Sequence, residues 1–179
     1  MNNNSQYEIM GKLKPWIASL LLLPLALFLI FNKGQFIFIL DHINLLFHEG
    51  GHGIFSLFGK FIYTLGGTLM QIIIPSLFIF YFFINKQRIG IQISLIYLAQ
   101  NLMNIGVYVA DARAQRLPLI GGKGTYHDWT FLLSRINMLE YDQFIGSLFY
   151  YTAILIIIFS LLLPLFVKDY DSINLDLKI

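Results

Sequence analysis

The sequence predicts an all-α fold: a polytopic bundle of about five transmembrane helices, with one longer loop that carries an interfacial helix. Of the 179 residues, 57% are hydrophobic and only 12% are charged, whereas soluble domains carry about 25% charged residues. Apolar runs long enough to cross a bilayer also recur along the chain. This length suits one transmembrane domain, residues 1–179, without a separate soluble domain.

The first two apolar runs differ in character. After a polar segment, 1–14, the first run covers about 15–31, with Pro15 suited to a helix start and Trp16 to the membrane interface. It lacks the small-residue pattern of a signal-peptide cleavage site, so we interpret it as a retained span. The second run, about 35–58, contains several ionisable and amide side chains. Such residues are costly in a bilayer and mark functional sites.

The remaining spans are predicted at about 64–84, 89–110 and 144–167. Segment 111–143 is the one long non-spanning stretch, and it includes a glycine-rich loop at 121–124. Apolar residues at helical spacing over about 129–139 predict an interfacial helix there. Five spans would place the two ends of the chain on opposite sides of the membrane.

Orientation follows from the Lys and Arg residues between the spans. With the N-terminus inside, the inner side holds seven of them and the outer side five, which weakly favours an N-terminus that faces inward. The inner set is Lys12, Lys14, Lys60, Arg113, Arg116, Lys123 and Arg135, and the outer set is Lys33, Lys86, Arg88, Lys168 and Lys178.

The second run contains a metal-binding motif, H-E-x-x-H, at positions 48–52. On a helix, His48 and His52 lie on the same face, where both imidazoles can bind one metal ion. Glu49 points in a neighbouring direction and is suited to act as a general base on water. Because a divalent metal also compensates buried ionisable groups, the motif predicts a Zn²⁺ site. Interhelical hydrogen bonding without a metal is the alternative.

The motif resembles that of the site-2 protease class of intramembrane zinc metalloproteases, particularly its small bacterial members. The resemblance continues through Gly66–Gln71 and Pro75 to Asn104 and Asp111, and covers about residues 36–128. It implies zinc held by the two motif histidines and by an aspartate from a later span. It also implies that the glutamate activates water. The asparagine–proline pattern that precedes this aspartate in the family is absent.

Three residues are candidates for the third ligand: Asp111, Asp128 and His127. A regular helix would place Asp111 about 10 Å too deep, although unwinding near Gly106 would change this. The loop after it could instead fold back and bring His127 and Asp128 to the metal. Of the three, we favour Asp111. The competing interpretations are ion pairing of Asp111 with Arg113 or Arg116, and capping of the next helix by 127–128.

Other polar residues are expected to support the site. Asp41 and Asn44 share a helix face with His48, and Asp41 is too far along the axis to be a ligand but could support the site electrostatically. Gln71 and Asn104 are candidates for positioning substrate or stabilising an oxyanion. Interhelical hydrogen bonding is their alternative role.

We therefore predict a zinc metalloendopeptidase that cleaves membrane-embedded or membrane-proximal proteins, in the bacterial cytoplasmic membrane. The expected partners are a membrane-protein substrate, the lipid bilayer and a regulatory membrane protein, with no nucleic acid. A zinc hydrolase of a non-peptide substrate and a non-catalytic membrane scaffold are the alternatives. The absence of cysteine excludes thiol catalysis, and the absence of a Gly-x-Ser-x-Gly elbow argues against a serine protease.

Overall fold

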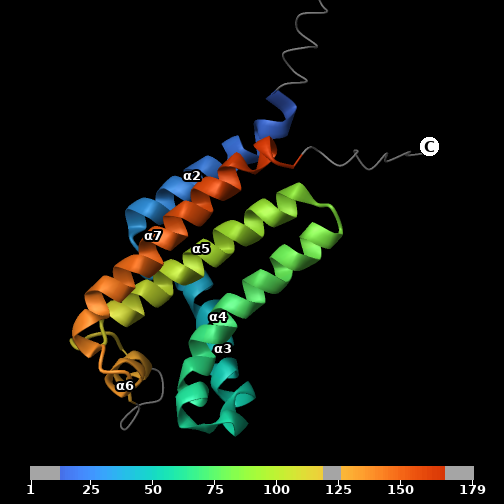
Figure 1. Ribbon diagram of the computed structural model, residues 1–179. Coiled ribbons are helices and arrows are strands. Elements are labelled where there is room, and N and C mark those ends of the chain that lie inside the picture. The colour runs from blue at the N-terminus through green and yellow to red at the C-terminus, as the bar shows by residue number, and fades with distance from the viewer. Residues whose placement is uncertain (1–12, 119–125, 168–179) are drawn as a thin grey trace, which may run out of the picture.

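The computed structural model describes residues 13–118 and 126–167, and the only regular secondary structure in these ranges is helical (Figure 1). The glycine-rich segment 121–124, residues 1–12 and the charged residues Lys123, Lys168 and Lys178 lie outside these ranges. The helices, with α for α-helices and η for 3₁₀ turns, are η1 Lys14–Trp16, α2 Ile17–Asn32, α3 Phe38–Ile54, η2 Ser56–Phe58, α4 Gly59–Ile84, α5 Arg88–Ala110, α6 Asp128–Arg135, η3 Leu139–Tyr141, α7 Asp142–Leu162 and η4 Leu163–Leu165.

Four helical segments of the described chain are long and apolar enough to cross a membrane. They contain α2, α4, α5 and α7, each with its adjoining 3₁₀ turn where one is present. The most apolar window of α5 is 61% buried, against 22% for the other three, so α5 is the central helix of the bundle. Large apolar side chains of the outer helices are exposed, as lipid-facing residues should be.

The α3 helix is not among these four, so five spans are not found in the described chain. It has 17 residues and carries the polar side chains that the sequence placed in a second span. It also starts partway along α5, because Asp41 contacts Gln100, and it runs towards the end of α5, where His48 packs on Tyr108. The chain therefore continues in the direction of α2 instead of recrossing the bundle.

This topology also corrects the predicted placement of the two ends. Arg88, at the start of α5, donates hydrogen bonds to the carbonyl oxygens of both Pro15 and Val167. The beginning of α2 and the end of α7 therefore lie at the same end of the bundle, as Figure 1 shows. The inward orientation of this end stays a prediction.

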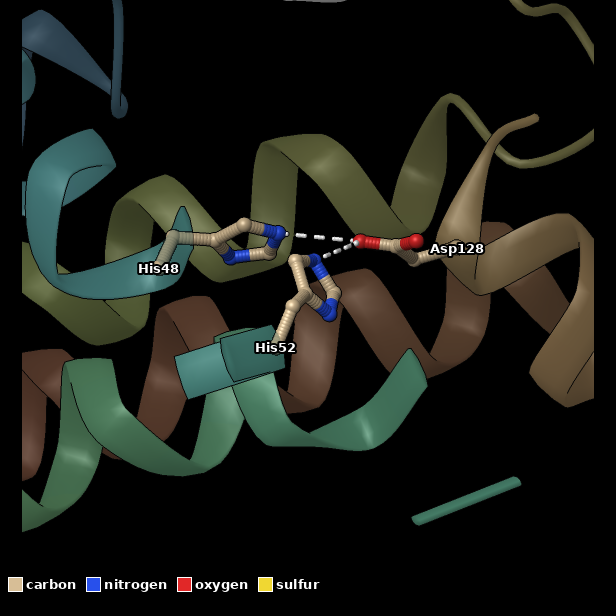
Figure 2. Close-up of side chains that lie close together, drawn as sticks. All are labelled: His48, His52 and Asp128. Carbon is tan, nitrogen blue, oxygen red and sulfur yellow. Dashed lines mark hydrogen bonds and ion pairs between the residues drawn. The ribbon is translucent and has the colours of Figure 1, made fainter. Parts of the chain in front are cut away.

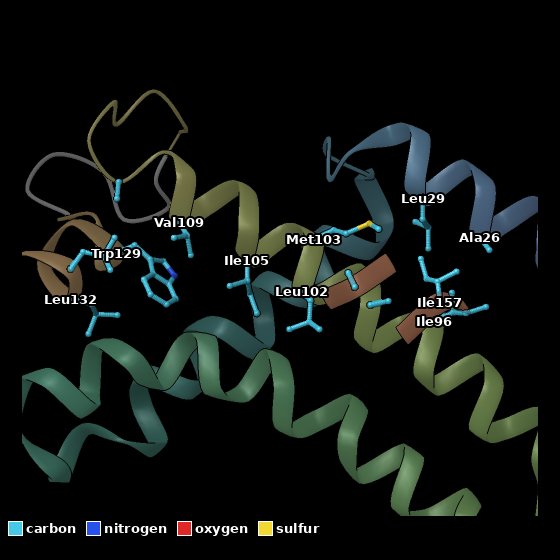
Figure 3. Close-up of a cluster of buried hydrophobic side chains, with 14 residues drawn as sticks. Ala26, Leu29, Ile96, Leu102, Met103, Ile105, Val109, Trp129, Leu132 and Ile157 are labelled. Carbon is cyan, nitrogen blue, oxygen red and sulfur yellow. The ribbon is translucent and has the colours of Figure 1, made fainter. Parts of the chain in front are cut away.

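Close packing along α5 holds the bundle together. Its apolar side chains meet α2, α6 and α7 in one core (Figure 3). Gly106 of α5 and Gly146 of α7 lie so close that a Cβ on either would stand within 2.8 Å of the carbonyl oxygen of the other. Small residues of this kind allow membrane helices to approach backbone to backbone.

A helix is present in the segment predicted to hold the interfacial helix: α6, which is shorter than expected and lies near the junction of α5 and α7. Its place at the membrane interface stays a prediction. Trp129, Leu132 and Leu133 bury it against the core. His127 is its N-cap and accepts a hydrogen bond from the backbone N–H of Thr130 at 3.4 Å. The first residue of the helix, Asp128, is thereby fixed close to α3.

Candidate metal centre

The two motif histidines lie on the face of α3 that is turned towards α6. Their ring centroids are 4.8 Å apart, and 8% of the His48 side chain and 12% of the His52 side chain are exposed. The α4 backbone comes close beside them, because Gly51 and Gly66 meet without side chains between the two helices. A Cβ at Gly67 would collide with the His48 ring. Glycine at this position therefore makes space for the imidazole.

Asp128 completes a group of three potential ligands, as Figure 2 shows. Its Oδ2 lies 2.9 Å from Nε2 of His48 and 3.2 Å from Nε2 of His52. One atom from each residue lies within 4.8 Å of the others. The group combines α3 with the first residue of α6, so the fold-back of the loop after α5 is the feature that assembles it.

Asp111, the favoured third ligand of the sequence analysis, lies outside this group. Its two carboxylate oxygens accept the backbone N–H groups of Arg116 and Leu117, at 3.0 and 2.9 Å, and so close the turn after α5. His127 is also outside the group, since its Nε2 faces Asp111 at 3.6 Å. Of the three candidates, the structure therefore brings only Asp128 to the histidines.

The other ring nitrogen of each histidine has a partner of its own. His52 Nδ1 lies 2.8 Å from the carbonyl oxygen of Tyr63, which can only accept, so Nδ1 carries the proton. His48 Nδ1 lies 3.0 Å from Oε1 of Gln71. Metal-bound histidines characteristically donate their second N–H in this way, which directs the Nε2 lone pair to the metal.

Without a cation, this arrangement is electrostatically unfavourable, because three electron-rich atoms face one another. With the protons on Nδ1, two Nε2 lone pairs and a carboxylate oxygen face one another in a buried space. Ligand atoms about 2.0–2.2 Å from a tetrahedral zinc ion stand roughly 3.4 Å apart, which is close to the 2.9 and 3.2 Å found here. The three residues therefore fit a divalent metal ion.

The protonation of Asp128 also suits a ligand. Burial opposes its ionisation, but when the two imidazoles carry protons on Nε2 in place of a metal ion, their hydrogen bonds and charges outweigh this and hold the pKa of Asp128 below its ordinary value. For His127, burial lowers the pKa despite the nearby Asp111 carboxylate. The ligand candidate is therefore a carboxylate, and the helix-capping histidine is neutral.

A cavity of about 590 Å³ opens beside the three ligands. Glu49 is exposed and lines this cavity together with His48, His52 and Asp128. Apolar walls come from the segment before α3, from α3, α5 and the loop after α5; they include Phe36, Leu45, Val107, Leu117 and Pro118. The candidate base thus has access to the space beside the metal ligands.

Gln71 and Asn104 also line the cavity, but their amides are engaged within the protein. Gln71 accepts from His48 and donates to Oδ1 of Asn104 at 3.1 Å. The interhelical role that the sequence left open for these residues is therefore present in the structure.

Two further contacts were not predicted. One is the Tyr63 carbonyl, and the other is the Tyr108 hydroxyl, which accepts the backbone N–H of Asp128 at 3.2 Å. A backbone carbonyl has no sequence signal, and a tyrosine in an apolar helix gives none that separates this role from packing.

Comparisons with protein-family models, with curated proteins and with solved structures give no match. The interpretation of the site therefore depends on its own geometry, and the resemblance to the site-2 protease class stays a prediction.

Proposed function

We propose that this protein is a zinc-dependent hydrolase that cleaves peptide bonds of membrane-embedded or membrane-proximal proteins. The observation that carries the proposal is the convergence of His48, His52 and Asp128 beside a cavity that Glu49 also lines. Two imidazole nitrogens and one carboxylate oxygen form a donor set that zinc prefers. Three protein ligands leave a position open, as in catalytic zinc sites.

The chemistry divides between the ion and the chain. When bound, zinc would act as a Lewis acid that polarises a carbonyl group and makes water more acidic. Glu49 would accept the proton of the attacking water and deliver it to the leaving amine. His48, His52 and Asp128 would hold the ion, and their buried surroundings strengthen electrostatic interactions at the site.

A peptide in the membrane is the substrate class that suits the cavity. Apolar side chains form much of its wall, and the three candidate ligands are among the polar residues that line it. Because two of the helices that line the cavity, α4 and α5, are long and apolar enough to cross a bilayer, a membrane protein would reach the site more readily than a soluble one. The proposal also includes the bacterial cytoplasmic membrane as the location of the protein and a regulatory membrane protein as a partner.

The test is the Glu49→Gln variant of the purified full-length chain, with the exposed Glu140→Gln as matched control. Hydrolysis of apolar quenched-fluorescent peptides in detergent micelles and zinc content are measured together. We expect Glu49→Gln to retain zinc and the helical circular dichroism spectrum but to lose cleavage. Glu140→Gln should behave as wild type.

The same assay separates the alternatives. Equal cleavage by Glu49→Gln and wild type would refute the mechanism. A zinc-loaded wild type that cleaves none of the peptides would point to a hydrolase of non-peptide substrates. Absence of stoichiometric zinc in wild type would favour a scaffold.

A further inference from the structure

A second buried carboxylate lies two helical turns before His48 on α3. Only 3% of Asp41 is exposed, and it does not belong to the group of metal ligands. Its Oδ2 accepts the backbone N–H of Ile37 at 2.5 Å, at the start of α3. Its Oδ1 accepts amide N–H groups from Gln100 at 2.6 Å, Asn44 at 3.2 Å and Asn104 at 3.4 Å.

These bonds determine which group donates and which accepts in a chain of hydrogen-bonded side chains. The chain runs from Asp41 through Asn104 and Gln71 to His48 at the metal centre. Because a carboxylate only accepts, Asn104 must turn its NH₂ group to Asp41 and its oxygen to Gln71. Gln71 donates its own NH₂ to that oxygen at 3.1 Å and so turns its oxygen to His48. The Nδ1 of His48, 3.0 Å from this oxygen, must then be the donor.

The amides alone could not enforce this direction. Each carboxamide offers both a donor and an acceptor, so Asn104 and Gln71 could turn around together and leave Nδ1 of His48 as the acceptor. The proton would then be on Nε2, the nitrogen that faces His52 and Asp128. Asp41 disfavours this reversed arrangement, because the oxygen of Asn104 would then face Oδ1 of Asp41, which only accepts.

We propose that Asp41 is a positioning residue that fixes the tautomer of His48 through Asn104 and Gln71, leaving its Nε2 lone pair for the metal. The inference rests on the proposed metal site. It gives a role to an acidic residue buried in an apolar bundle, where an ionisable side chain is costly and needs partners.

The first test is Asp41→Asn in the full-length protein in detergent micelles, with Asp142→Asn as matched control. Asp142 is also a buried aspartate, 1% exposed, but it pairs with Arg113 and takes no part in the chain. Changes around a metal ligand typically weaken metal binding by about 10–100-fold. We expect a zinc affinity reduced by that factor in Asp41→Asn and unchanged in Asp142→Asn.

The second readout is ¹⁵N NMR of the histidine ring nitrogens in metal-free protein, which distinguishes the two tautomers directly. It is taken in an Asp128→Ala background, because without metal the Asp128 carboxylate, 2.9 Å from Nε2 of His48, would itself attract a proton to that nitrogen. In this background, His48 should carry its proton on Nδ1 when Asp41 is present and populate both tautomers in Asp41→Asn. Asn104→Leu removes the link but leaves the other three bonds of Asp41, including the one that holds the start of α3. It should give the same loss of tautomer preference without depending on the fold of the Asp41 variant.

A rescue variant moves the carboxylate to the other end of the chain. In the Asp41→Asn/Gln71→Glu double variant, the introduced carboxylate can accept from Nδ1 of His48 directly. Asn104 would then reverse its amide, donating its NH₂ group to position 71 and accepting from the new amide at position 41. Net charge is unchanged, and zinc affinity and the Nδ1 tautomer should return towards wild type. A merely structural role for Asp41 predicts no such recovery.

The outcomes are separable. An unaltered His48 tautomer in Asp41→Asn or Asn104→Leu would overturn the inference, as would a folded double variant that does not recover the tautomer. Because this readout is taken without metal, it tests the inference even if wild type binds no zinc. That last result would overturn the proposed function alone.

Discussion

Because Gly67 leaves space for the His48 ring, we predict that Gly67→Ala displaces this ring. A Cβ at this position would stand 2.5 Å from Nε2 of His48, against at least 3.4 Å for an ordinary contact, so the ring must shift by about 0.9 Å. Ligand distances in metal sites hold to within about 0.2 Å. The shift is therefore several times the tolerance of a metal ligand.

The expected result is a loss of metal binding without a loss of folding. The three nearest atoms to the added Cβ all belong to the His48 ring, and alanine is favoured over glycine within a helix by about 1 kcal/mol. Zinc affinity, measured by competition with a chelating dye in detergent, should fall by at least about 10–100-fold, the range seen for changes around a ligand. The thermal unfolding midpoint of the metal-free protein should not fall.

Gly53→Ala is the matched control, because it lies on α3 beside the motif and its added Cβ would meet no atom within 4 Å. It should bind zinc as wild type does. If Gly67→Ala also kept wild-type affinity, His48 would not be a ligand in the position described, and the reasoning about the site would be refuted.

Three further predictions concern the ligands, the packing beside them and the metal. Asp128→Ala should abolish stoichiometric zinc while Asp111→Ala retains it, as metal analysis of the purified variants would show; the opposite pattern would restore Asp111 as the third ligand. Gly51→Ala should lower the thermal unfolding midpoint, since its Cβ would stand 2.2 Å from the Gly66 carbonyl oxygen and overpacking costs about 1–3 kcal/mol; an unchanged midpoint would contradict this close approach. Adding a chelator to wild type should also lower the midpoint, because a ligand at 100 times its Kd contributes about 2.7 kcal/mol, and a chelator without effect would argue against a bound ion.

The sequence predicted most helices well because their signals are local. Long apolar runs located α2, α4, α5 and α7, and the H-E-x-x-H spacing located two ligand candidates. The second run is not found among the helices long and apolar enough to cross a membrane, and hydrophobicity and length do not show in which direction a chain continues after a turn. Lys33 and Gly34, both at positive φ, make that turn, and α3 then follows the direction of α2.

Identifying the third ligand candidate required knowledge of contacts between residues far apart in the sequence. Depth along regular helices could compare α3 with α5, but it could not show how the chain after Asp111 returns. The structure adds two facts that favour Asp128 over Asp111: backbone N–H groups occupy the Asp111 carboxylate, and His127 caps α6 so that Asp128 is its first residue. Neither residue spacing nor composition predicts these contacts.

The origin of Asp128 on an eight-residue helix has a consequence for control of the centre. His48 and His52 belong to a helix that packs along α4, whereas the carboxylate comes from a short element after the central helix. The complete ligand set therefore depends on how α6 packs against the core through Trp129, Leu132 and Leu133, in addition to the packing of α3 on α4.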